Sequence, residues 1–157
     1  MRAQQGLTLL EAMVVIMIMM STMVFGMSFT QQWYADRQLD AQVRDVKGLM
    51  QQAQLASMDH GRPWTLCGSR DGQRCDGQWQ HLLVMDAERH VRYHLESHEA
   101  ITLRWKGLSK ALVFQPRLSG SMLNGTFYLC HTRETRKLIV NRLGRTRVET
   151  VETKGEC

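Results

Sequence analysis

The sequence predicts an α+β fold, with one long N-terminal helix followed by a small head of antiparallel strands. An uncharged apolar run over residues 12–29 continues into a segment whose apolar residues recur at helical spacing. Beyond Gly61 the pattern changes to short apolar runs that are separated by turns rich in Gly, Ser, Asp and Asn. A chain of 157 residues, less about fifty in a helix, leaves enough for one small domain with a modest core.

The apolar run has the length of a membrane span. Its 18 residues form a helix of about 27 Å at about 1.5 Å per residue, close to the hydrocarbon thickness of a bilayer. Glu11 stands at the start of the run, and a short basic leader precedes it. A carboxylate in or beside hydrocarbon is costly, so its presence indicates a function.

The helix is expected to continue beyond Phe29 as an amphipathic segment. Apolar residues from Leu39 to Ala53 follow one another at steps of four and three, and charged residues occupy the other faces. The first proline is Pro63, and the preceding Asp-His-Gly is a plausible helix end. The expected parts are a leader, an apolar helix, its amphipathic continuation and a β-rich head, at residues 1–6, 7–30, 31–60 and 61–157.

Eight segments of the head are expected to form strands. They cover residues 64–66, 80–85, 91–95, 101–105, 111–115, 125–130, 136–140 and 145–150. The last two are separated by a short segment that ends in Gly144. This arrangement predicts a β-hairpin in which Gly144 takes the left-handed conformation.

The sequence Gly-Leu-Thr-Leu-Leu-Glu at residues 6–11, followed by an uncharged apolar run, resembles the signal of type IV pilins and type II secretion pseudopilins. The resemblance implies cleavage by a prepilin peptidase after Gly6, so that Leu7 begins the mature chain. It also implies that Glu11 neutralises the N-terminal amine of a neighbouring subunit during assembly. An ordinary secretory signal is disfavoured, because its cleavage site follows the apolar run.

Three parts of the head resemble the H-type minor pseudopilins and the FimT-like minor pilins, namely residues 78–79 with 82–86, residues 114–120 with 125–130, and residues 138–140 with 144–147. This family resemblance implies a type IV pilin-like fold and a protein that is not an enzyme and needs no cofactor. The implied partners are other pilins in a filament, the prepilin peptidase and inner-membrane lipid before assembly. The implied location is the inner membrane with the head in the periplasm, and later a pilus on the surface of a Gram-negative bacterium.

All four cysteines lie beyond the apolar helix, at positions 67, 75, 130 and 157. An even number in an exported domain indicates disulfides formed in an oxidising compartment. Three pairings are possible. We favour Cys67–Cys75, which closes a local loop, and Cys130–Cys157, which attaches the C-terminal tail. Zinc is the competing explanation, and the absence of any Cys-x-x-Cys pair in the sequence argues against it.

The net charge of +5 is distributed unevenly along the chain. Residues 1–100 contain 9 Lys or Arg against 11 Asp or Glu, whereas residues 101–157 contain 11 against 4. The basic character therefore belongs to the C-terminal third. Such an asymmetry favours a polyanionic partner, although many solvated protein faces are also basic.

The sequence Gly-Arg-Thr-Arg at residues 144–147 is the sharpest feature of the head. If a strand follows Gly144, Arg145 and Arg147 point to one face about 6–7 Å apart, and each guanidinium can bind one phosphate. A Gly-Arg-x-Arg motif in FimT-like pilins of transformable bacteria is implicated in DNA binding. The resemblance therefore suggests non-specific binding of double-stranded DNA for uptake. Four further basic residues are expected at this site, namely Arg133, Arg136, Lys137 and Arg142.

Two other functions remain open. Pseudopilins of type II secretion systems carry similar Gly-Arg-x-Arg segments without binding DNA, so the chain could start or cap a secretion filament. A weaker alternative is a head that recognises an anionic surface. A metal site at histidines 90, 94 and 98 is disfavoured, because residues 91–95 alternate as a strand does and would not align the three histidines on a helix.

Overall fold

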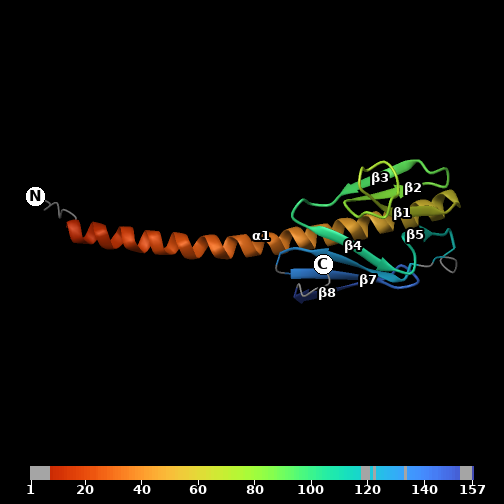
Figure 1. Ribbon diagram of the computed structural model, residues 1–157. Helices are drawn as coiled ribbons and strands as arrows, with labels where there is room; N and C mark the ends of the chain where they lie inside the picture. The colour runs from red at the N-terminus through yellow and green to blue at the C-terminus, as the bar shows by residue number, and fades with distance from the viewer. Residues whose placement is uncertain (1–7, 118–120, 122, 133, 153–156) are drawn as a thin grey trace, which may run out of the picture. The chain divides into compact units, whose positions relative to one another are not determined.

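The structure, a computed structural model, describes residues 8–117, 121, 123–132, 134–152 and 157, with the side chains of 24–32 and 152 excepted. The chain forms two compact units, residues 1–36 and residues 37–157. One helix and eight strands are found in the described part, in the order helix first and strands after it (Figure 1). The α+β class with antiparallel strands, predicted from the sequence, is confirmed.

The helix α1 runs over Leu9–His60. Its start is capped, because the Glu11 amide donates a hydrogen bond of 3.3 Å to the Thr8 hydroxyl, and Glu11 adds a negative charge to the first turn. Gly61 ends the helix with a φ of 63°, the left-handed conformation that glycine adopts at helix C-termini. The predicted end at the Asp-His-Gly sequence is therefore confirmed.

In the first unit, the described large apolar side chains of α1 from Leu9 to Met23 are all exposed. Ser21 and Thr22 satisfy their hydroxyls locally by donating to the carbonyl of Ile18, at 2.9 and 3.0 Å. Among the described residues, no helix combines the length and the apolar character required of a membrane span.

The strands form two antiparallel four-stranded sheets. The first has the order β3-β2-β1-β5 and consists of β1 (Trp64–Ser69), β2 (His81–Met85), β3 (Val91–Glu96) and β5 (Ala111–Phe114). The second has the order β4-β6-β7-β8 and consists of β4 (Thr102–Gly107), β6 (Gly125–Cys130), β7 (Glu134–Val140) and β8 (Thr146–Glu152). All eight predicted strands exist, with ends shifted by a few residues. The chain leaves the first sheet after β3, returns to it for β5, and leaves it again for β6.

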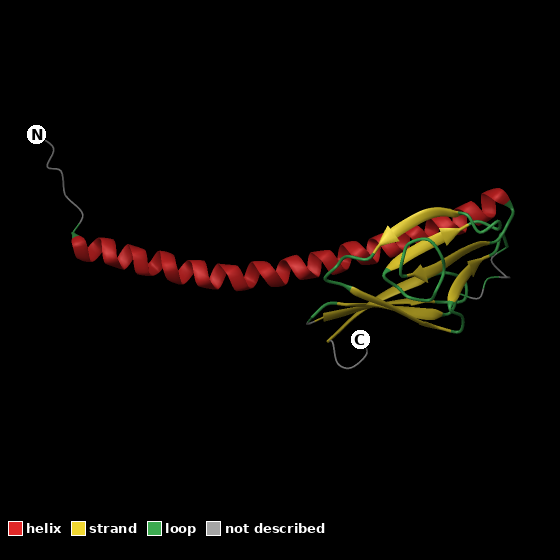
Figure 2. Cartoon of the chain, turned by 45° about the horizontal axis from the view of Figure 1, so that its top comes forward, coloured by secondary structure: helices red, strands yellow, loops and turns green. Residues whose placement is uncertain are grey.

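The core of the second unit lies between the amphipathic part of α1 and both sheets (Figure 2). The helix contributes the stripe predicted from the sequence, Leu39, Val43, Val46, Met50 and Ala53, together with Leu49 and Ala56. The sheets contribute one apolar face each, with members that include Leu66, Leu82, Leu112, Phe114, Phe127, Leu129 and Leu138. Burial of these side chains is the main favourable term in folding.

The tryptophan and phenylalanine rings of the head lie in its core or pack against it. Phe127 is fully buried, and the rings of Trp105 and Trp79 lie 4.5 and 5.3 Å from it, centroid to centroid. Trp64 is also buried, and Tyr128 on the opposite side of β6 is half-buried. This agrees with the expectation that the three tryptophans belong to the core and that strand alternation buries one of the two adjacent aromatics.

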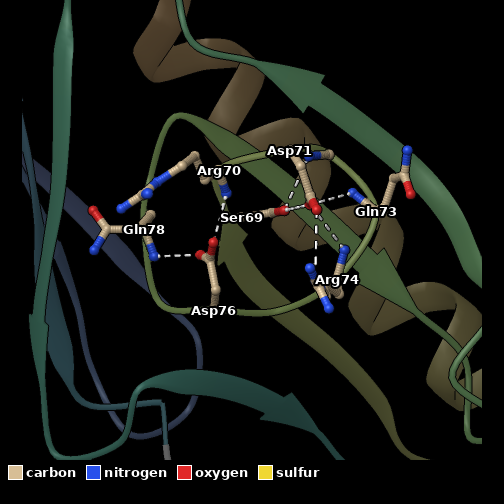
Figure 3. A network of polar contacts seen from close by, with 8 residues as sticks. Ser69, Arg70, Asp71, Gln73, Arg74, Asp76 and Gln78 are labelled. Carbon is tan, nitrogen blue, oxygen red and sulfur yellow. Dashed lines mark hydrogen bonds and ion pairs between the residues drawn. The ribbon is translucent and has the colours of Figure 1, made fainter.

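Both favoured disulfides are present. Cys67 bonds to Cys75 and Cys130 bonds to Cys157, with Cα atoms 5.6 and 6.2 Å apart. The first bond closes a loop that polar contacts further organise (Figure 3). In this loop Asp71 accepts hydrogen bonds from the Gln73 amide and the Ser69 hydroxyl, which hold the pKa of its carboxyl below the usual value.

We expect Leu138→Ala to lower the free energy of unfolding by about 2–5 kcal/mol, because Leu138 is fully buried and its truncation leaves a cavity. The control is Leu143→Ala, since Leu143 is 51% exposed and should change stability by less than about 1 kcal/mol. Urea unfolding of the full chain in detergent, followed by tryptophan fluorescence, measures both. Equal effects of the two substitutions would contradict the assignment of Leu138 to the core.

Candidate nucleic-acid interface

The hairpin between β7 and β8 is shaped by Asn141 and Gly144. The Gly144 amide donates to the Asn141 carbonyl at 3.0 Å, and the Asn141 side-chain oxygen accepts from the amides of Leu143 and Arg145 at 3.0 and 2.9 Å. Gly144 has a φ of 79°, so the predicted left-handed conformation is confirmed. A Cβ at this position would also lie 3.2 Å from the Leu123 side chain. Glycine is therefore the residue that this turn favours.

Arg145 and Arg147 lie on the same side of the second sheet. Arg147 pairs with Ile139 of β7, and the register continues to the turn through a hydrogen bond of 3.0 Å from the Asn141 amide to the Arg145 carbonyl. Both arginines are exposed. Two residues of extended chain place their Cα atoms about 6–7 Å apart, as the sequence predicted.

The pairing of the strands brings further basic residues to this outer face. One row across β4, β6, β7 and β8 consists of Lys106, Thr126, Ile139 and Arg147. The neighbouring row consists of Arg104, Tyr128, Lys137 and Glu149. We call these eight residues, together with Arg145, the outer face. It carries five basic side chains and one acidic side chain.

Arg104 and Lys106 were missed by the sequence interpretation. Their alternation with Leu103 and Trp105 in β4 indicates which side of the strand is polar, but not which strand lies beside β4. Only the sheet order places them on the same face as the hairpin arginines. In the structure, Arg104 donates a hydrogen bond of 3.0 Å to the Cys157 carbonyl, so the C-terminal residue lies next to this row.

The other predicted basic residues have different surroundings. Arg142 is exposed in the turn, and Lys137 is half-buried with its ammonium 5.4 Å from the centre of the Tyr128 ring. Such a position allows a cation–π attraction. Arg133 lies outside the described residues, as do Gly6 and Leu7 of the expected cleavage site.

Arg136 is a correction to the predicted set. Its side chain is only 10% exposed, and it forms ion pairs with Asp40 of α1 at 3.2 Å and Glu134 at 2.6 Å. Burial alone lowers the pKa of Arg136, but the hydrogen bonds to Glu134 and Asp40 outweigh it and raise the pKa above the usual value. Alternation along β7 turns Arg136 inward with Leu138, whereas Lys137 and Ile139 point outward. Arg136 therefore connects the helix to the sheet.

Histidines 90, 94 and 98 lie in and beside a strand rather than along one face of a helix. Val91–Glu96 is a strand, as predicted, and His94 contacts His81 of β2 with their ring nitrogens 3.1 Å apart. Within the described residues, no group of three or more His, Cys, Asp or Glu side chains is arranged to hold a metal ion.

A long N-terminal helix whose second half packs against an antiparallel β-rich head is the architecture of type IV pilin-like proteins. The sequence model of the family described as Type II transport protein GspH matches residues 42–144, which is more than half of the chain. The protein therefore belongs to the GspH family. No curated protein matches the sequence.

Solved structures of minor pilins and pseudopilins are similar to this chain. The Pseudomonas aeruginosa type IV minor pilin FimU, in one crystal form, is 18% identical with a TM-score of 0.56, and the match covers 73% of this chain and 90% of FimU. The minor pseudopilin EpsH of the Vibrio cholerae type 2 secretion system is 11% identical with a TM-score of 0.54, and the match covers 71% of this chain and 96% of EpsH. At these identities the likeness establishes the fold.

We expect Arg136→Gln to lower the free energy of unfolding by about 1–3 kcal/mol, because Asp40 and Glu134 lose their shared cation in a largely buried position. The matched control is Arg62→Gln, which breaks the exposed Arg62–Glu88 pair and should cost less than about 1 kcal/mol. Chemical denaturation of the full chain compares the two. The assignment of Arg136 to the interior is wrong if Arg62→Gln lowers the free energy of unfolding as much as Arg136→Gln does.

Proposed function

We propose that this protein is a minor type IV pilin that binds extracellular double-stranded DNA non-specifically for uptake in natural transformation. The observation that carries the proposal is that Arg145 and Arg147 lie on one exposed side of a hydrogen-bonded hairpin. Planar guanidinium groups form paired hydrogen bonds with phosphate oxygens, and their spacing along the strand is on the scale of consecutive phosphates.

The rest of the outer face supports the same partner. Arg104, Lys106 and Lys137 extend the positive charge from the hairpin across the sheet to β4. Adjacent strands lie about 4.8 Å apart, so the basic residues at the two edges are separated by about 14 Å. A polyanion that crosses the sheet would therefore meet cations at both edges rather than at the hairpin alone.

The expected mode of binding is contact with phosphates without reading of bases. The buried aromatic rings offer no stacking platform, and Tyr128 is the single aromatic residue of the outer face. Binding through phosphates is independent of sequence and weakens as salt is added. Several heads along a filament would raise the overall affinity above that of one head.

Assembly and location are part of the proposal. The chain would be held in the inner membrane by residues 7–30 with its head in the periplasm, and a prepilin peptidase would cut after Gly6. Glu11 would then neutralise the amine of a neighbouring pilin as the filament grows, and the filament would reach the cell surface. The two disulfides suit an oxidising compartment such as the periplasm.

A second candidate function is a minor pseudopilin that starts or caps the filament of a type II secretion system. The match to the GspH family and the likeness to EpsH favour it. In this case the basic hairpin would contact acidic residues of neighbouring subunits instead of DNA. The two functions differ in the phenotype that loss of the gene would cause.

Arg145→Gln combined with Arg147→Gln should weaken binding of a random-sequence DNA duplex about 10-fold or more and reduce the salt dependence by about one to two phosphate contacts. The control is Arg70→Gln with Arg74→Gln, which removes the same charge from the exposed disulfide loop of the first sheet. Fluorescence anisotropy of the full chain in detergent measures both. DNA uptake is the wrong function if the parent chain does not bind at low salt, or if both double variants bind alike.

In the native host, deletion of the gene should abolish transformation and leave secretion of exoproteins intact. Complementation with the Arg145→Gln, Arg147→Gln double variant should restore filament assembly but not transformation. A deletion that blocks secretion while sparing transformation would instead establish the pseudopilin function.

A further inference from the structure

The two arginines of the hairpin differ in what their side chains contact. Within the described part of the chain, the Arg145 guanidinium lies in no ion pair, and the hydrogen bond at this residue comes from its backbone amide. The Arg147 guanidinium, in contrast, lies 2.5 Å from a carboxylate oxygen of Glu149. The side chains of Arg147 and Glu149 remain 73% and 41% exposed. One arginine therefore points freely into solvent, while the other is occupied by an acid at the surface.

Glu149 is placed to affect more than one cation of the outer face. It follows Arg147 by two residues on β8, so both side chains stand on the same side of the sheet. It also lies directly opposite Lys137 on β7. The only acidic side chain of the outer face is thus between two of its basic side chains.

We propose that Glu149 is an internal competitor for DNA, which occupies Arg147 and reduces the affinity of the outer face for phosphate. This inference rests on the proposed DNA binding. A carboxylate and a phosphate are bound by the same kind of guanidinium donors, so a phosphate at Arg147 competes with Glu149 for them. The remaining carboxylate then repels the phosphate backbone beside it. Arg145 is the contact available at all times, and Arg147 contributes fully only when its donors are released by Glu149.

Weak binding of one head has a consequence for a filament. A head whose affinity is held down by Glu149 releases DNA readily, while several heads together still retain it. DNA that is drawn along or past a filament must dissociate from each subunit, and the competitor favours this release. Glu149 therefore tunes affinity, whereas Arg145 and Arg147 supply the contacts.

The test uses Glu149→Gln in the full chain in detergent, with a fluorescent random-sequence DNA duplex as probe and anisotropy as readout over a range of salt concentrations. We expect binding to tighten about 3- to 10-fold, because the substitution breaks an exposed ion pair and removes one charge that repels phosphate. The salt dependence of binding should steepen by about one phosphate contact. Because the Glu149 side chain lies at the surface outside the core, thermal unfolding should show that the variant folds as the parent does.

The matched control is Glu88→Gln. Glu88 also forms an exposed ion pair with an arginine, Arg62, and its substitution adds the same charge, but it lies in the turn between β2 and β3 of the first sheet. The control should tighten binding less than about 2-fold, because it changes only the net charge. Equal gains for Glu149→Gln and Glu88→Gln would overturn the proposal.

A double-mutant cycle locates the effect at Arg147. In the Arg147→Gln background, Glu149→Gln should lose most of its gain, because no guanidinium is left to release. Arg145→Gln should weaken binding by the parent more than Arg147→Gln does. An undiminished gain from Glu149→Gln in the absence of Arg147 would overturn the competitor role.

These outcomes separate the two proposals. If the parent binds DNA and loses affinity with Arg145→Gln and Arg147→Gln, the proposed DNA binding stands whatever Glu149→Gln does. The competitor role is then decided by comparing Glu149→Gln with Glu88→Gln. If the parent fails to bind at low salt and Glu149→Gln fails as well, both proposals are wrong. Binding by Glu149→Gln alone would reject DNA binding as the function of the parent chain, and the competitor role with it.

Discussion

The packing of the amphipathic half of α1 against two sheets is the interaction on which the rest of the head depends. Neither sheet has a second apolar layer of its own among the described elements, and each buries its inner face in the core that includes Leu39, Val46 and Ala53 of the helix. Small sheets with one apolar face are not stable alone, because exposed apolar surface and unsatisfied edges cost more than the strands gain. Arg136 adds a polar connection to this packing through Asp40 of α1.

The division of each strand into an inner and an outer side explains why the same segment supports both folding and the candidate site. In β7, Leu138 and Val140 enter the core and Lys137 points outward, while in β4 Leu103 is buried and Arg104 is exposed. The core therefore holds the outer face in register without using its charges. A polyanion would meet side chains whose backbone positions are set by pairing along four strands rather than by a mobile loop. The charges on that face are unequal in availability, since Arg147 has a carboxylate partner within its own strand.

Prediction from the sequence succeeded where the signal was local. The helix stripe, the alternating strands, the left-handed Gly144 and the pairing of nearby Cys67 and Cys75 all depend on residues close in sequence, and the structure contains each of them. It failed for Arg136, because a count of basic residues does not say which side of a strand is covered. It also missed Arg104 and Lys106, because β4 and β8 are four strands apart in sequence but belong to one sheet.

The sequence by itself determined the class of the protein, an amphipathic helix with a disulfide-linked β head, since periodicity, turn residues and cysteine number are properties of the linear chain. Only the tertiary structure decided which charges share a surface. Sheet order is set by how the apolar faces fit together in the core, and this long-range packing leaves no mark within any short segment. For that reason the outer face with its ion pair between Arg147 and Glu149 became visible only when β4, β6, β7 and β8 were placed side by side.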